Sequence, residues 1–534
     1  MPCSRPARLL IATAAMLLAL AWVWRFQIAG GFTRTFGDRY DAVIEIALLQ
    51  HWSNALAGVE AWNRVAWFHP AADTLGYNDG YLVSGLLYAA GRGGGLSPFG
   101  AAELAHAVLK AAGFAGMALL LRRAGSVRFG WAVFGATLFT IADLTIAHAN
   151  HGQLFTLGFA PWVALAGWGM VGAIGEGDRR RVLRWGLAFA GLFALWISTA
   201  YYLAWFFALY ALVLAVFVLA RGGSVRPVLA AWRPLLIVAA AGLVMLLPFL
   251  LVYLPKAAET GMHAPDIALR TTLWPIELLN TGPQNLLWGW LPQAIRASYA
   301  PGLMRNPDAV FGMPPLFLIA SVAAVLWTQR GADRVRLAPV GAALLVCWLL
   351  MLNLGGVFPW RAVHWLVPGA GGVRVVGRFA ILLLLPATFL LTVALDRMKR
   401  RALPIAALLL AEPVATAAPV SLDVVERSAA LAAVPTPPTE CRSFAVVQAT
   451  PPARVNPALD PVYAGNVDAM VLASLWGRPT VNGVSTFGPQ GWDFAQTTAT
   501  DYPARVRRYA AGFGLHGVCL LDMRNQQPWS RLSE

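Results

Sequence analysis

Charged residues are scarce in this chain of 534 residues, and acids are the scarcest of them. Asp, Glu, Lys and Arg make up 13% of the sequence, with 26 acids against 41 bases, whereas 58% of the residues are hydrophobic. So few charges cannot cover a soluble globule of this length, which excludes a soluble domain and indicates a polytopic membrane protein. The net charge of +15 does not indicate nucleic-acid binding, because the arginines lie in short clusters between apolar runs, where they orient membrane spans.

Cysteine is also rare, and the chain has four: Cys3, Cys347, Cys441 and Cys519. No two of them have the CxxC spacing and they form no cluster with histidines, so the sequence indicates neither a zinc site nor a redox motif. The chain has no internal repeat, which argues against the repeated halves that are common among transporters.

What the chain does have is a series of long apolar runs. The first, from about residue 9 to 24, ends without a small-x-small cleavage site, which favours an uncleaved span over a signal peptide. With the first run, the others give about eleven spans of a mostly α, polytopic helical bundle. These others lie at about 100–121, 129–147, 153–173, 184–201, 202–220, 232–252, 311–328, 337–353, 375–395 and 402–419.

Arginine clusters give this bundle an orientation. They fall in alternate connections, for example at 179–184, 330–336 and 397–401, and the positive-inside rule puts these connections and the N-terminus in the cytoplasm. We expect a first span in 1–26, an external loop in 27–98, a bundle in 99–420 and an external domain in 421–534. Lys110, inside a span, is expected either to adjoin a cavity or to pair with Glu103.

Both large external loops are expected to carry function. Residues 27–98 contain no run of roughly 20 apolar residues, so we expect this loop to hold two interfacial helices, near 38–57 and 79–92. The second loop, at about 253–310, is long and without periodicity, which is typical of a functional loop or lid.

The C-terminal region has a different composition. Strand-like patches at 443–447 and 517–521 and a helical patch at 503–511 predict a small external α/β domain. Cys441 and Cys519 lie at the start of the two strand-like patches, and an oxidising compartment favours a disulfide between them over two isolated core thiols. The run from Gly477 to Gly483 predicts a turn without a chemical role.

Three acids stand together at the start of the first external loop. Asp38, Asp41 and Glu45 recur at i, i+3 and i+7, so that a helix would present all three on one face. They are either a solvated helix start or a site in which a carboxylate acts as general base on a hydroxyl.

Two arginines open the tenth expected span from its outer side. Arg374 and Arg378 are four residues apart, so in a helix both guanidinium groups would reach one anion, such as a lipid phosphate that leaves during a reaction. The alternative is that both side chains extend to lipid headgroups.

The predicted layout resembles that of the GT-C class of integral-membrane glycosyltransferases. It has one span, then a long external loop that opens with Gly37-Asp38-Arg39-Tyr40-Asp41, then many further spans and an external C-terminal domain. The resemblance implies an inverting transfer of a hexosyl or pentosyl group from a polyprenyl-phosphate donor to a hydroxyl of an acceptor glycan, lipid or protein. It implies the inner membrane of a bacterium as the location, with the C-terminal domain in the periplasm. Asp38 would be the base, supported by Asp41.

The same resemblance implies roles for polar residues elsewhere. The short external connection at 143–153 would face the first-loop acids, and Asp79 would join them. The substrate-binding residues would be Glu45, Asp79, His148, His151, Gln153, Arg374 and Arg378. A binding site for a divalent cation on Asp38, Asp41, His148 and His151 is an open alternative, and no other cofactor is expected.

Two other classes of protein share these features. A transporter or lipid flippase is also polytopic and arginine-rich inside, but it usually carries ionisable residues at the middle of the bilayer. A non-catalytic membrane protein of cell-envelope assembly, whose external domain is the working part, is the other alternative.

Overall fold

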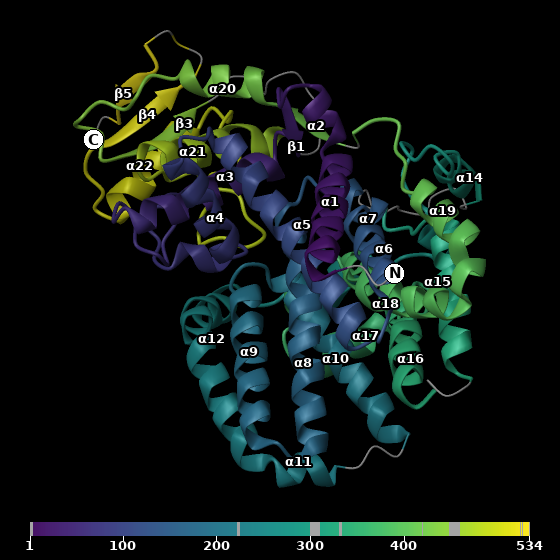
Figure 1. Cartoon of the computed structure of the whole chain (residues 1–534). Helices are drawn as coiled ribbons and strands as arrows, with labels where there is room; N and C mark the ends of the chain where they lie inside the picture. Colours follow the sequence, from purple (N-terminus) through teal and green to yellow (C-terminus); the bar gives the residue numbers. More distant parts are fainter. Residues whose placement is uncertain are drawn as a thin grey trace.

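The computed structural model describes residues 4–221, 225–298, 310–330, 334–418, 420–447, 460–523, 525 and 527–532. It is mostly helical, with two small sheets (Figure 1). The long helices of the bundle are α1 (Arg5–Val23), α5 (Pro98–Arg123), α6 (Phe129–Thr140), α8 (Ala160–Glu176), α9 (Arg179–Ile197), α10 (Tyr201–Ala220), α12 (Trp232–Thr260), α15 (Pro315–Thr328), α16 (Arg334–Leu350) and α18 (Phe379–Met398).

Short helical segments connect them. These are α2 (Arg25–Ala29), α7 (Asp143–Ala147), η2 (Gly152–Phe159), α11 (Arg226–Ala230), α13 (Pro265–Leu269), η3 (Pro275–Leu279), α14 (Leu291–Ser298), α17 (Trp360–Leu366), η4 (Ala370–Gly372), η5 (Val376–Arg378), η6 (Lys399–Ala402) and α19 (Leu403–Ala411).

Seven stretches of the described residues are long and apolar enough to cross a membrane. Of the about eleven expected spans, those at 375–395 and 402–419 lie largely within one helical stretch, Val376–Ala411. Three others are not among the seven: α9 begins with an arginine cluster, α15 has 14 residues and α16 has 17. The protein is therefore a multi-pass membrane protein in class, and its number of spans stays a prediction.

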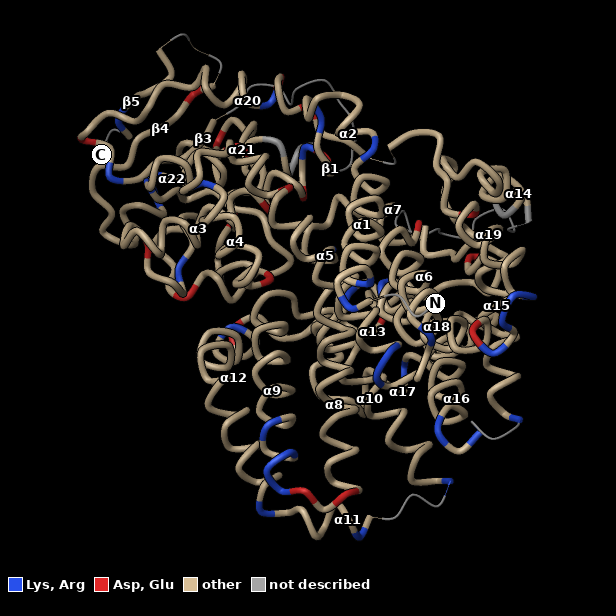
Figure 2. The backbone as a smooth tube through the Cα atoms, viewed as in Figure 1, with Lys and Arg blue, Asp and Glu red and all other residues tan. Residues whose placement is uncertain are grey.

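Basic residues gather at one end of this bundle. Figure 2 shows Lys and Arg around α11 and at the neighbouring ends of α9 and α10, far from the C-terminal elements. The positive-inside rule would place this end in the cytoplasm, and the orientation of the bundle stays a prediction.

The first loop and the C-terminal region pack against each other. The loop contributes β1 (Arg34–Phe36), α3 (Asp41–Leu56), η1 (Thr74–Tyr77) and α4 (Leu82–Gly93). The C-terminal region contributes β2 (Ser421–Asp423), α20 (Val424–Ala432), β3 (Ser443–Val447), α21 (Asp460–Trp476), α22 (Tyr502–Gly512), β4 (Val518–Asp522) and β5 (Trp529–Arg531). β1 pairs antiparallel with β2, while β3 and β4 are parallel and β5 is antiparallel to β4.

Backbone hydrogen bonds and a shared core join these two regions. Thr480 donates its backbone N–H to the carbonyl of Ala66 at 2.7 Å, and Phe68 donates to that of Asn482 at 2.9 Å. Side chains of α3 and of α21 enter one hydrophobic cluster with Trp67. The two regions that the sequence suggested as separate domains thus stabilise each other.

Helix α3 differs from the predicted interfacial helix. It is apolar on most sides, packs against α4, α5 and α21, and buries Glu45 and His51 as well as its apolar residues. A helix that is hydrophobic all round is a core helix, which explains the difference. In the C-terminal region, Cys441 and Cys519 form a disulfide at the base of the β3–β4 pair, and Cys347 is a buried free thiol.

Candidate active site

A cavity of about 550 Å³ lies where the first loop, the bundle and the C-terminal region meet. Its lining comes from residues far apart in the sequence, which only the fold brings together. The polar and charged ones among them are Asp41, Tyr77, Asn78, Asp79, Tyr81, His151, Gln153, Tyr201, Tyr202, Tyr253, Lys256, Thr260, Arg374, Arg378, Tyr463, Ser485 and Thr486.

Asp41, and not Asp38, presents its carboxylate to this cavity. α3 begins at Asp41, so Asp38 precedes the helix and does not share a helical face with Asp41, contrary to the prediction. The Asp38 carboxylate accepts hydrogen bonds from the backbone N–H of Tyr40 at 2.8 Å and from the side chain of Asn150 at 3.4 Å. The Asp41 side chain is 40% exposed, and it is among the residues that line the cavity.

The two acids have opposite pKa shifts. Burial raises the pKa of Asp38, and the charge of Asp41 raises it further. Burial also acts to raise the pKa of Asp41, but a hydrogen bond from His151 and the charges of Arg378 and Arg374 outweigh it and lower that pKa. Asp41 is therefore the acid that stays ionised at neutral pH most firmly.

His151 links Asp41 to Arg378. Nδ1 of His151 is 3.1 Å from Oδ2 of Asp41, and Nη2 of Arg378 is 2.9 Å from Nε2 of the same ring. Because a guanidinium group only donates hydrogen bonds, Nε2 must accept, so Nδ1 carries the proton and donates it to Asp41. Arg378 is only 5% exposed, and its Nε has no hydrogen-bond partner.

Arg374 and Arg378 both line the cavity, but not as a helical pair. Between them the chain is extended at Val375 and then forms the 3₁₀ turn η5, so the predicted helical spacing is wrong. Thr271 holds this backbone: its hydroxyl donates to the carbonyl of Arg374 at 2.8 Å and accepts the N–H of Val376 at 2.9 Å. The two side chains reach one cavity because of this bracket, which the local sequence does not reveal.

Asp79 and Gln153 also line the cavity, as the prediction of binding roles requires. The Asp79 carboxylate accepts the N–H of Tyr201 at 2.9 Å, at the first residue of α10, and burial raises the pKa of Asp79. Gln153 accepts a hydrogen bond at 2.7 Å from the hydroxyl of Tyr81.

Two residues predicted to bind substrate do not line it. Glu45 lies 2.8 Å from Nε2 of His106 inside the core, against Gly152. His148 stacks on Phe311 with ring centroids 4.2 Å apart, and its Nε2 lies 2.9 Å from the carbonyl oxygen of Val310. Burial lowers the pKa of His148 to about 3, so this ring is neutral and structural.

The residues suggested for a divalent cation do not form a donor set. The described residues include no group of three or more His, Cys, Asp or Glu side chains arranged around a metal. In addition, the ring nitrogens of His151 already face Asp41 and the cationic group of Arg378.

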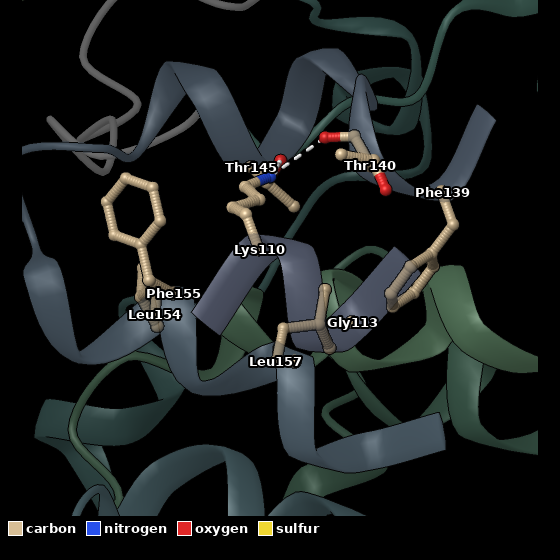
Figure 3. Close-up of a pocket in the computed structure, with 9 residues that line it drawn as sticks. Lys110, Gly113, Phe139, Thr140, Thr145, Leu154, Phe155 and Leu157 are labelled. Carbon is tan, nitrogen blue, oxygen red and sulfur yellow. Dashed lines mark hydrogen bonds between the residues drawn. The ribbon is translucent and has the colours of Figure 1, made fainter. Parts of the chain in front are cut away.

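Lys110 adjoins a second, far smaller cavity of about 10 Å³ (Figure 3). Its ammonium group donates to the carbonyl of Thr140 at 3.0 Å and to the hydroxyl of Thr145 at 2.6 Å. Glu103, the alternative partner, instead accepts hydrogen bonds from Trp24, Thr35 and the N–H of Phe36. Of the two expectations for Lys110, the structure agrees with a position beside a cavity and not with a pairing with Glu103. This cavity is too small for a substrate.

The prediction missed two groups in the main cavity. Lys256 donates to the hydroxyl of Tyr77 at 3.0 Å and to Glu259 at 2.8 Å, and Tyr77 donates to Glu259 at 2.7 Å. The sequence could have indicated this cluster, because Lys256 and Glu259 are opposite charges three residues apart at the end of an apolar run. Residues 484–487 of the C-terminal region carried no signal, because most of the other lining residues lie far away in the sequence.

These features define a class: a multi-pass membrane protein with a polar cavity where its bundle, its first loop and its C-terminal region meet. Among solved structures, the chain is similar to the arabinofuranosyltransferase AftD from mycobacteria, with a TM-score of 0.51 and 17% sequence identity. The match covers 92% of this chain and 32% of that one, so this chain spans about a third of the length of that protein. The likeness shows a shared fold. No protein-family model and no curated protein matches the sequence.

Proposed function

We propose that this protein is a membrane glycosyltransferase that moves a sugar from a polyprenyl-phosphate donor to a hydroxyl group of an acceptor, with inversion at the anomeric carbon. The solved structure with the shared fold is a glycosyltransferase, which supports the class of reaction. Because that protein is named for arabinofuranosyl transfer, a pentofuranosyl donor is the first to test.

One observation carries this proposal: Asp41, Arg374 and Arg378 line the same cavity. A transfer from a phosphate ester needs a base for the acceptor hydroxyl and a cationic site for the departing phosphate. The cavity contains both, and it adjoins helices that are apolar enough to lie in a membrane. Trp205, Phe249 and Leu254 add apolar surface on which the first isoprene units of a donor would lie.

In the proposed step, the acceptor oxygen attacks the anomeric carbon from the side opposite the phosphate. A glycosidic bond forms while the bond between that carbon and the phosphate oxygen breaks. The acceptor proton passes to the Asp41 carboxylate, and the bonding electrons leave with the polyprenyl phosphate, whose charge Arg374 and Arg378 stabilise.

Asp41 replaces Asp38 as the leading candidate for the base. Asp41 lines the cavity and has the lowered pKa, whereas Asp38 is not among the lining residues and accepts a hydrogen bond from Asn150. A carboxylate of low basicity suits this role because the phosphate is a good leaving group and the acceptor loses its proton late in the step. Asp79 and Gln153 serve as hydrogen-bonding groups for the sugar hydroxyls.

The test uses the purified full chain in lipid nanodiscs, with short-chain polyprenyl-phosphoryl pentofuranose and hexose donors and release of polyprenyl phosphate as the readout. Asp41→Asn should lower the rate by a factor of about 100 or more, the usual contribution of a general base. Asp266→Asn is the matched control, because Asp266 is exposed in α13 and lies outside the cavity lining. Wild-type turnover by Asp41→Asn would refute the assignment.

A further inference from the structure

The turn at Gly477–Gly483, which the sequence left without a role, leads directly into the cavity. Val484, Ser485, Thr486 and Phe487 follow it and line the cavity, together with Tyr463 of α21. We call these five residues the C-terminal wall. No other part of the C-terminal region is among the lining residues described for this cavity.

Hydrogen bonds and close packing hold the chain segment that precedes the C-terminal wall. Asn482 is fully buried, and its amide nitrogen donates at 2.9 Å both to the side-chain oxygen of Asn466 and to the hydroxyl of Tyr502. Its amide oxygen accepts the N–H of Val446 at 2.8 Å. At the next position, a Cβ on Gly483 would lie 2.4 Å from the ring of Phe68, so a larger residue does not fit there. The wall is therefore fixed in place before any ligand arrives.

The C-terminal wall is also attached to the other sides of the cavity. Ser485 donates its hydroxyl to the carbonyl of Tyr77 in the first loop. The ring of Phe487 stacks on His263, just beyond α12, with centroids 4.6 Å apart and planes at 24°. The wall thus bridges the first loop and the end of α12, and it borders the same space as Asp41.

The chemistry of this wall differs from that of the donor side. The arginines Arg374 and Arg378 suit a phosphate, whereas the C-terminal wall has aromatic rings and hydroxyl groups and carries no charge. Flat aromatic faces combined with short hydroxyl side chains suit a ligand that is apolar on its ring face and hydroxylated at its edge. A saccharide has this character, whereas a lipid chain would offer the hydroxyl of Thr486 no hydrogen-bond partner.

The C-terminal wall also lies close to the start of α3, where Asp41, the proposed general base, is located. The ring of Tyr463 lies 5.5 Å from that of Tyr40, the residue before Asp41. Tyr463 and Asp41 line the same cavity, so a sugar that rests against Tyr463 shares that space with the Asp41 carboxylate. We propose that the C-terminal wall is the acceptor subsite and that its ligand is a saccharide; this inference rests on the proposed function.

The test compares two fates of the donor: transfer to an added oligosaccharide and hydrolysis by water. Thr486→Ala and Phe487→Ala should each lower kcat/KM for an arabino-oligosaccharide or for maltotetraose by about tenfold, and leave donor hydrolysis unchanged. The matched controls are Thr500→Ala and Phe513→Ala, exposed residues of the same region that do not line the cavity. Equal losses in transfer and hydrolysis, or no loss in transfer, would overturn the inference.

A binding measurement separates this inference from the proposed function. Saturation-transfer NMR with the same two oligosaccharides and the intact chain needs no turnover. If wild-type protein binds them, and Phe487→Ala does not, the subsite stands even when no donor is consumed and the proposed transferase activity fails. Binding that is equal in wild type and Phe487→Ala would overturn it, as would transfer only to a lipid or peptide hydroxyl.

Discussion

His151 should set the pH range in which the enzyme works. Its Nδ1–H donates to Asp41, and the ring receives a hydrogen bond from Arg378 at 2.9 Å. Replacing His151 with Phe keeps a ring of similar size in this largely buried position but removes both hydrogen bonds. Asp41 then loses one of the interactions that lower its pKa.

The size of the effect follows from that hydrogen bond. A hydrogen bond to a charged group contributes about 1.5–3 kcal/mol, and one pH unit corresponds to about 1.4 kcal/mol. Because the Asp41 side chain is 40% exposed, solvent screening reduces the gain. We therefore expect the acid limb of the rate profile to move upwards by about one pH unit.

The direction of this shift follows from the proposed role of Asp41 as the general base. The base works when it is ionised, and the lowered pKa of Asp41 keeps the wild-type acid limb below the ordinary range of aspartate. Without His151 the carboxylate binds its proton at a higher pH, so activity is lost earlier on acidification. The rate at neutral pH should fall less than the rate near pH 4.

The assay is the initial rate of polyprenyl phosphate release between pH 3.5 and 8. His148→Phe is the matched control, since His148 lies three residues away, outside the cavity lining, and makes its hydrogen bond to Val310. His151→Gln can accept from Arg378 and donate to Asp41, and it should restore part of the acid limb. An acid limb that is unchanged in His151→Phe, or that moves equally in His148→Phe, would refute the reasoning.

Three further predictions concern the acids and the C-terminal unit. Asp38→Asn should slow turnover by less than tenfold, because Asp38 does not line the cavity; a loss as large as that of Asp41→Asn would reverse their ranking. Gly483→Ala should destabilise the fold by about 1–3 kcal/mol through the clash with Phe68. Thermal unfolding measures this effect, with Gly512→Ala, which meets open space, as the control expected to retain the wild-type Tm. Replacing Cys441 and Cys519 with Ser should lower the free energy of unfolding by about 2–4 kcal/mol. The wild-type protein should migrate differently on a gel with and without a reducing agent, and identical mobility would contradict the disulfide.

The helical, multi-pass class follows from the sequence because long apolar runs have few alternatives to membrane helices. The position of the acidic motif was also predictable, but not the order of its members. The spacing of Asp38, Asp41 and Glu45 suggested one face, whereas α3 starts at Asp41 and packs the next turn, with Glu45, against His106. Periodicity alone does not reveal where a helix starts or which face the core takes.

The rest of the site depends on contacts between distant segments. Thr271 sets the backbone between Arg374 and Arg378, and Ser485 meets Tyr77 across more than four hundred residues. Neither contact has a local pattern of hydropathy or charge. The C-terminal wall of the cavity was therefore not predictable before the fold was known, whereas the charges of Arg374 and Arg378 stood out against an apolar background.

The most direct test of the central claim is a cryo-EM structure of the protein in nanodiscs with a polyprenyl phosphate added. Our account predicts a phosphate within hydrogen-bonding distance of Arg374 and Arg378 in the 550 Å³ cavity, on the same side as Asp41. A lipid phosphate bound only outside this cavity, with the two arginines turned to headgroups, would contradict it.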